Sequence, residues 1–182
     1  MKYLRMLKLK DGRDCVLRSA RAGDAETELE LFRSTHSQTD FLTSYPDEFT
    51  FSSQQQAEFL SRKEARPDEV EILAEVGGTV VGLGSLERIG WAEKTRPRVE
   101  FGVIVEKGYW SAGIGRALTL ACLECARRAG YSQVELDVVA DNTAALRLYE
   151  SVGFTEYGRN PRGFRSRTGQ WQELVLMRLE LD

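Results

Sequence analysis

Apolar residues follow two different spacings along this chain, and the alternation between them predicts the order of its elements. Short runs rich in Val, Ile and Leu are typical of strands, whereas apolar residues that recur every three or four positions are typical of helices. In chain order the pattern predicts a strand at residues 15–20, two helices at 22–37 and 52–65, three strands, a long helix, a strand, a short helix and two late strands. We therefore expect an α+β fold with a mixed sheet of about seven strands and about four helices.

Small polar residues and glycines mark the ends of these elements. Asp24 is placed to cap the first helix, and Ser52 or the serine after it opens the second. Gly77 and Gly78 separate two β-rich runs and predict a hairpin, because both central residues of such a turn often need φ > 0. Gly130 follows the long helix, as is typical of a helix C-terminus.

Composition and charge narrow the class of protein. A chain of 182 residues with 42% hydrophobic content can bury one sizeable core, so residues 1–182 are expected to form a single domain. Lys and Arg total 25 against 28 Asp and Glu, a net charge of -3, which leaves no basic field to attract nucleic acid. Charged residues interrupt the N-terminal apolar positions, and no later run could span a bilayer. With three cysteines, too few for a disulfide framework, we expect a cytoplasmic protein that binds neither nucleic acid nor membranes.

The stretch GYWSAGIGRALTL, residues 108–120, joins a predicted strand to the long helix. A helix start leaves backbone N–H groups unpaired and can hold phosphate oxygens where no side chain blocks them. Gly113 and Gly115 remove such side chains, although a tight turn that needs φ > 0 would also explain them. Two known motifs do not fit, because Ile114 takes the lysine position of a Walker A loop and Leu118 takes the third small position of a dinucleotide fingerprint.

Two segments resemble the GCN5-related N-acetyltransferase (GNAT) family. WSAGIG at residues 110–115 is similar to the family's acetyl-coenzyme A signature, R/Q-x-x-G-x-G/A, and DNTAALRLYESVGF at 141–154 is similar to its second coenzyme A segment. Trp110 departs from the signature, since many members carry Arg or Gln there, and Arg116 could supply the positive charge instead.

This resemblance implies the fold and the reaction. It implies one GNAT-like domain with a central, mostly antiparallel mixed sheet. It also implies direct transfer of an acetyl group from acetyl-coenzyme A, a co-substrate used without a metal, to a primary amine of a small molecule or peptide.

The resemblance further implies roles for individual residues. The cofactor-binding residues would be Val103, Ile104, Val105, Ser111, Ala112, Gly113, Ile114, Gly115, Arg116, Asn142 and Ala145. Two strands would separate so that the pantetheine arm can pair with residues 103–105, and Asn142 would also cap the short helix. Tyr149 would donate a proton to the leaving thiolate, and Glu100 would accept the proton of the amine. A core tyrosine and a solvent-facing strand glutamate are the ordinary alternatives.

Two other functional classes compete with this interpretation. Cys122 and Cys125 form a C-x-x-C pair, and Cys15 with His36 would complete a Cys3His zinc set. Both cysteines of the pair fall within the long helix, however, and small buried hydrophobes explain them better. The second class is a noncatalytic coenzyme A sensor, which would keep the glycine turn but lack a working acid or base.

The acceptor amine is not determined by the sequence. Three loops are expected to face it, at residues 36–51, 89–97 and 158–171. The first carries acidic residues that suit a cationic amine. The last carries the arginines Arg159, Arg162, Arg165 and Arg167, which suit a carboxylate-bearing amino acid or an acidic peptide. The arginine loop could equally be a solubilising surface or the subunit-facing surface of a homodimer.

Overall fold

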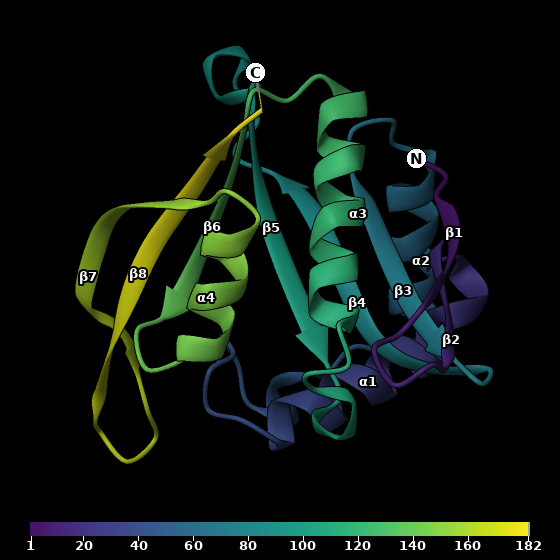
Figure 1. The fold of residues 1–182 in the computed structure, drawn as a ribbon, viewed down its shortest axis with the longest axis horizontal. Helices are drawn as coiled ribbons and strands as arrows, with labels where there is room; N and C mark the ends of the chain where they lie inside the picture. Colours follow the sequence, from purple (N-terminus) through teal and green to yellow (C-terminus); the bar gives the residue numbers. More distant parts are fainter. Residues whose placement is uncertain (182) are drawn as a thin grey trace.

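A single eight-stranded sheet runs through the protein (Figure 1). The computed structural model describes residues 1–181. The strands are β1 (Leu4–Lys8), β2 (Asp14–Ser19), β3 (Val70–Val76), β4 (Thr79–Arg88), β5 (Arg98–Val105), β6 (Gln133–Val139), β7 (Thr155–Arg165) and β8 (Trp171–Glu180). Their order in the sheet is β1-β2-β3-β4-β5-β6-β8-β7, and every neighbouring pair is antiparallel except β5 and β6, which are parallel.

Four helices cover the two faces of this sheet. They are α1 (Ala25–Ser37), α2 (Ser53–Ala65), α3 (Ile114–Ala129) and α4 (Thr143–Ser151). In Figure 1, α3 and α4 lie in front of the sheet, and α1 and α2 lie behind it. Each face has its own apolar core, with Leu118 of α3 in the larger core and Leu60 of α2 in the smaller one, both fully buried. The expected α+β fold with four helices and a mixed sheet is therefore confirmed.

The sheet differs from the expectation at both of its edges. The count of about seven strands missed β1, whose apolar residues alternate with Lys and Arg and whose Leu4 and Met6 are each 75% exposed. At the other edge β7 continues to Arg165, although the sequence predicted a loop from residue 158. Two register shifts interrupt the pairing of β7 with β8, so its polar residues do not alternate with a regular period.

Most predicted element ends are found in the structure. Ser52 caps α2 by accepting a hydrogen bond from the Gln55 amide, and the glycines at 77 and 78 both have positive φ in the β3–β4 turn. Gly130 ends α3 in the left-handed conformation. Asp24 is the N-cap residue of α1, as predicted, but its carboxylate binds the Arg18 guanidinium and the Arg21 amide and makes no hydrogen bond to an amide of α1.

A network of buried polar side chains lies between the sheet and the helices α1 and α2. Glu28 is fully buried, and Gln56 donates a 2.7 Å hydrogen bond to one of its oxygens. Lys63 bridges Glu71 and Glu87 at 3.0 Å each. Desolvation, and then the charge of Glu71, raises the pKa of Glu28, so the fold favours its protonated form.

This burial predicts a pH dependence of stability. A carboxyl group that binds its proton more tightly in the folded state than in the unfolded state makes the free energy of unfolding decrease as pH rises between the two pKa values, by at most about 1.4 kcal/mol per pH unit. Glu28→Gln mimics the protonated acid, so the variant should lose less stability than the parent between mildly acidic and mildly alkaline pH. Urea denaturation across this range measures the slope. Glu26→Gln, an exposed change on the same helix, should keep the parent's slope, and equal slopes in all three proteins would contradict the assignment.

Candidate active site

The strands β5 and β6 separate along their length and open a gap in the sheet. β5 pairs with β4 from Val99 to Val105, but it pairs with β6 only from Arg98 to Glu100. Beyond Glu100, one edge of β5 has no neighbouring strand among residues 1–181. The separation that the family resemblance implied is present in the structure.

The register of β5 determines which peptide groups face this gap. The Glu106 amide donates to the Val81 carbonyl at 2.9 Å, so alternate residues on β5, Ile104 among them, direct their peptide groups at β4. The peptide groups of Val103 and Val105 consequently face the gap. The Trp110 indole N–H donates to the Val105 carbonyl at 2.7 Å. The amide and carbonyl groups of Val103 and the amide of Val105 therefore point into the gap.

The turn before α3 presents a series of backbone amides. Ser111 has φ +63° and Gly113, the residue preceding α3, has φ +99°, the left-handed conformation that favours glycine. These two values turn the chain into the helix. No backbone carbonyl among residues 1–181 accepts a hydrogen bond from the amides of Ser111, Gly113, Ile114, Gly115 or Arg116. The side chains of Ala112 and Ile114 are buried, so their contribution to this turn is limited to the backbone.

Positive side chains surround these amides. Lys10, Arg116 and Arg147 line the cavity beside the turn. None of the three is ion-paired within the part of the chain that the structure describes. Together with the partial positive charge of the helix start, they favour an anionic ligand such as a phosphate.

Helix α4 forms the opposite wall. Asn142 caps it by accepting a 3.2 Å hydrogen bond from the Ala145 amide, so its predicted capping role is confirmed. Tyr149 is 8% exposed, and its ring packs against Phe101 and Phe154 with centroids 6.2 and 5.8 Å away. Desolvation raises the pKa of Tyr149 to about 12, so its hydroxyl stays protonated at neutral pH and can act as a hydrogen-bond donor.

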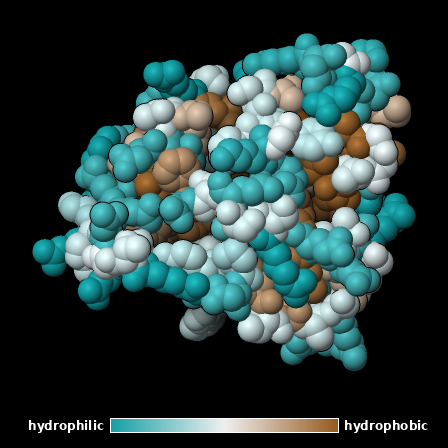
Figure 2. Space-filling view, turned by 90° about the horizontal axis from the view of Figure 1, so that it is seen from below, coloured by the Kyte–Doolittle hydropathy of each residue, from teal (hydrophilic) through white to brown (hydrophobic). Residues whose placement is uncertain are grey.

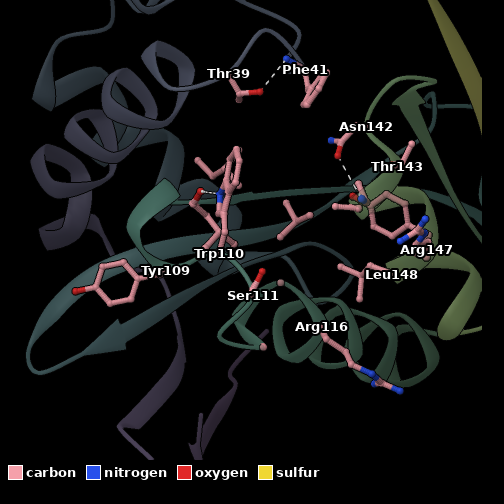
Figure 3. A pocket seen from close by; sticks show the side chains of 18 of the residues that line it. Thr39, Phe41, Tyr109, Trp110, Ser111, Arg116, Asn142, Thr143, Arg147 and Leu148 are labelled. Carbon is pink, nitrogen blue, oxygen red and sulfur yellow. Dashed lines mark hydrogen bonds between the residues drawn. The ribbon is translucent and has the colours of Figure 1, made fainter. Parts of the chain in front are cut away.

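The walls enclose one cavity of about 590 Å³. Figure 3 shows Asn142 and Arg147 on one side, Trp110 and Ser111 on the other, and Phe41 above them. Of the residues predicted from the sequence, those that line the cavity are Val103, Ile104, Val105, Ser111, Gly113, Gly115, Arg116, Asn142, Ala145 and Tyr149. Seen from the end that carries α1, the surface is largely hydrophilic with apolar side chains in its hollows (Figure 2).

Glu100 does not belong to the cavity lining. It alternates with Phe101 along β5, so its exposed side chain lies on the sheet face opposite α4. Partial desolvation, followed by the charge of Asp137 and of the carboxylates on β4 and β6, raises the pKa of Glu100. A base at this position would therefore become competent at a higher pH than an ordinary glutamate.

Several cavity residues were missed by sequence reasoning. Thr39, Phe41 and Leu42 belong to the loop at residues 36–51 that was expected to face the acceptor, but no motif singled them out individually. Lys10 comes from the turn after β1, the strand that was not predicted. Arg147 could have been found, because it lies within the segment that matched the family.

The three predicted acceptor loops do not share one end of the sheet. Residues 36–51 and the β7–β8 hairpin touch each other, since Arg167 pairs with Asp47 at 2.7 Å. The loop at residues 89–97 lies at the far end of β5 (Figure 1). None of its residues lines the cavity, so the cavity lining gives no support to its predicted place beside the acceptor.

The residues of the suggested zinc set are not assembled. The three cysteines are buried in the larger apolar core, whereas His36 packs edge-on against Phe49 with ring centroids 4.5 Å apart. Among residues 1–181 no three His, Cys, Asp or Glu side chains are grouped so as to hold a metal ion. The same residues contain no helix with the length and apolar character needed to cross a membrane.

Comparison with known proteins agrees with this architecture. The chain is 31% identical over 111 residues to an L-methionine sulfoximine/L-methionine sulfone acetyltransferase of Salmonella typhimurium, a match that covers 61% of this chain and 64% of that one. It is 38% identical over 108 residues to an N-alpha-acetyltransferase of Mycobacterium tuberculosis, covering 58% and 64%. The chain thus spans just under two thirds of the length of these relatives.

A solved structure shares the fold. A putative acetyltransferase of Salmonella typhimurium, determined with its cofactor acetyl-CoA, superposes with a TM-score of 0.82 over 98% of this chain and 95% of that one, at 23% identity. The sequence model of the acetyltransferase (GNAT) family matches residues 34–154, which contain β3 to β6, α3 and α4. With the open gap beside β5 and the amide-lined turn both inside that matched region, the chain belongs to the GNAT acetyltransferase family.

Proposed function

We propose that residues 1–182 form a single acetyltransferase domain that moves the acetyl group of acetyl-CoA to a primary amine. One observation carries the proposal: the free peptide edge of β5 and the unpaired amides at the start of α3 open into the same cavity. Both relatives are named as acetyltransferases, one of L-methionine sulfoximine and L-methionine sulfone and the other an N-alpha-acetyltransferase. Buried free cysteines suit the reducing cytoplasm.

The residues of the cavity fit the chemistry of coenzyme A. Its pyrophosphate would be held by the amides of residues 111–116, with Lys10, Arg116 and Arg147 supplying positive charge. Its pantetheine amides would pair with the peptide groups of Val103 and Val105, as an added strand does. When bound, acetyl-CoA supplies the thioester whose acetyl group is transferred.

Two side chains would handle the protons of this reaction. The amine must be neutral to attack, and the departing thiolate must gain a proton or a hydrogen bond. Tyr149, protonated and on the cavity wall, is our proposed donor to the thiolate. Glu100 is our proposed acceptor of the amine proton; because its side chain lies outside the cavity, it would act through water.

Acetyl-CoA should bind saturably and stabilise the protein. A ligand held at about 100 times its dissociation constant adds about 2.7 kcal/mol to the free energy of unfolding, which thermal melting and calorimetry can measure. NADH, which shares the adenine nucleotide but not the pantetheine, is the control and should have little effect. If acetyl-CoA at millimolar concentration produced neither heat nor a shift in melting temperature, the proposal would fail. Amine-dependent release of free thiol then distinguishes an enzyme from a noncatalytic sensor.

A further inference from the structure

One segment that lines the cavity is held by side-chain contacts near both of its ends. We call residues 38–48, which follow α1, the strap. At its start the Gln38 side chain donates to the Glu106 carboxylate at 2.5 Å and accepts from the Lys107 amide at 2.7 Å. These two residues directly precede the amide-lined turn. The first attachment therefore joins the strap to the proposed cofactor side of the cavity.

The second attachment joins the strap to the β7–β8 hairpin. The Arg167 guanidinium binds both oxygens of Asp47, at 2.7 and 2.8 Å, and lies 4.0 Å from the centroid of the Tyr45 ring. The Arg167 amide donates to the Tyr45 hydroxyl at 2.9 Å, and the Gln172 side chain donates to the Asp40 carbonyl at 3.0 Å. Four separate contacts thus hold the strap against the hairpin.

Between the two attachments the strap forms part of the cavity wall. Thr39, Phe41 and Leu42 line the cavity, and Figure 3 shows Thr39 and Phe41 across from Trp110. The amide-lined turn and α4 supply most of the remaining wall.

This arrangement bears on the size of the acceptor. A peptide substrate needs an open groove in which the chain beyond its reacting amine can continue. Here the strap and the hairpin are joined to each other, so a chain that continued between them would have to displace the Arg167–Asp47 and Gln172–Asp40 contacts. Accordingly we infer that the acceptor is a small amine enclosed beneath the strap, not the end of a polypeptide, and that the Arg167–Asp47 contact sets this limit. The inference rests on the proposed function and specifies its substrate class.

The first test compares acceptors of two sizes with the unmodified protein. Free amino acids, monoamines and diamines are assayed beside decapeptides that begin with the same amino acids, with thiol release as the signal. We expect the best free amine to exceed the best decapeptide at least about 100-fold in kcat/KM, the discrimination available when a misfit displaces the reacting group by about 1 Å. Decapeptides acetylated as fast as the free amines would overturn the inference while leaving the acetyltransferase proposal intact.

The second test loosens the strap. Arg167→Ala removes the ion pair with Asp47 and the contact with the Tyr45 ring. It should raise KM for the small amine about tenfold and reduce the preference for free amines over decapeptides. The dissociation constant of acetyl-CoA should be unchanged. Arg165→Ala is the matched control, because Arg165 lies on the same hairpin against Trp171 and forms no ion pair or side-chain hydrogen bond with residues 38–48. If KM rose equally in both variants, the proposed role of the strap in limiting the size of the acceptor would be contradicted.

A measurement that does not depend on turnover completes the test. Hydrogen–deuterium exchange of residues 38–48 should be faster in Arg167→Ala than in the parent, and unchanged in Arg165→Ala. Equal exchange in all three proteins would overturn the inference even if no acceptor were found. Calorimetry with acetyl-CoA on the same samples separates the role of the strap from the proposed function. If the parent protein did not bind acetyl-CoA, the proposed function itself would fail.

Discussion

Tyr149→Phe is expected to lower kcat by about 10²- to 10⁴-fold, the usual cost of removing a general acid. The hydroxyl is the only group that the substitution deletes, so the packing of the ring against Phe101 and Phe154 should be kept. Affinity for acetyl-CoA and the melting temperature should therefore change little. Rates are best compared in single turnovers, where chemistry and not product release is observed.

Two controls accompany this prediction: a second tyrosine variant and the pH dependence of the rate. Tyr131→Phe removes a second buried hydroxyl, one that donates to the Asp68 carbonyl at 2.9 Å away from the cavity, and it should cost stability but not rate. Glu100→Gln should remove the acidic limb of the pH profile, which lies above the usual range of a glutamate because the pKa of Glu100 is raised. Tyr149→Phe should leave that limb in place. Near-normal turnover of the Tyr149→Phe enzyme would rule out its role as the acid.

Gly115→Val should weaken the binding of coenzyme A roughly 10- to 100-fold. Gly115 lies in the first turn of α3, and a β-carbon added there would already meet the Leu148 side chain at 3.4 Å. The two further methyl groups of valine would extend into the space in front of the amides. Losing one hydrogen bond to a charged group costs about 1.5–3 kcal/mol, which corresponds to the stated change in the dissociation constant. Calorimetric titration measures it directly.

A second glycine of the same stretch provides the control for this prediction. Gly108 lies in the turn before the amides, does not have positive φ and has open space around it, so Gly108→Val should leave cofactor affinity close to that of the parent. Gly113 is less suitable, because its φ of +99° would strain any substituted residue whatever the ligand requires. If Gly115→Val lowered stability but bound coenzyme A normally once folded, this glycine would serve the packing of α3 on α4 alone.

Local patterns were sufficient to predict the parts of the fold that local chemistry determines. Ser52, Gly130 and Asn142 end or begin helices through hydrogen bonds and conformations that span only a few residues, and each was placed correctly. Asp24 was placed correctly before α1, but its hydrogen-bond partner was not predicted, because Arg18 lies on a strand that no local pattern links to it. Likewise, charged residues interrupt the apolar pattern of β1, so the strand is recognised only by its pairing with β2.

In the candidate site, too, the features that a local segment determines were predicted, and those that depend on long-range contacts were not. The amide-lined turn and the short helix were recognisable because each occupies a continuous segment that resembles the family. Which peptide groups of β5 face the gap depends on its register with β4, and the place of Phe41 depends on contacts between the strap and distant elements. Such long-range contacts leave no mark in a short stretch of sequence. Lys10 was therefore found only in the folded chain, and the loop at residues 36–51 was predicted as a whole without the individual residues that line the cavity.

The two shifts of register in β7 also bear on how copies of this protein can meet. An edge strand with a regular row of unpaired peptide groups is a template for another strand, and natural proteins guard against such pairing with bulges and charges. β7 is bulged between Glu156 and Gly158 and again between Asn160 and Phe164, and it is rich in arginine. Strand-to-strand extension of the sheet into a second molecule is thereby disfavoured at this edge. A homodimer that formed by pairing strands across two sheets would therefore not be expected to use the β7 edge.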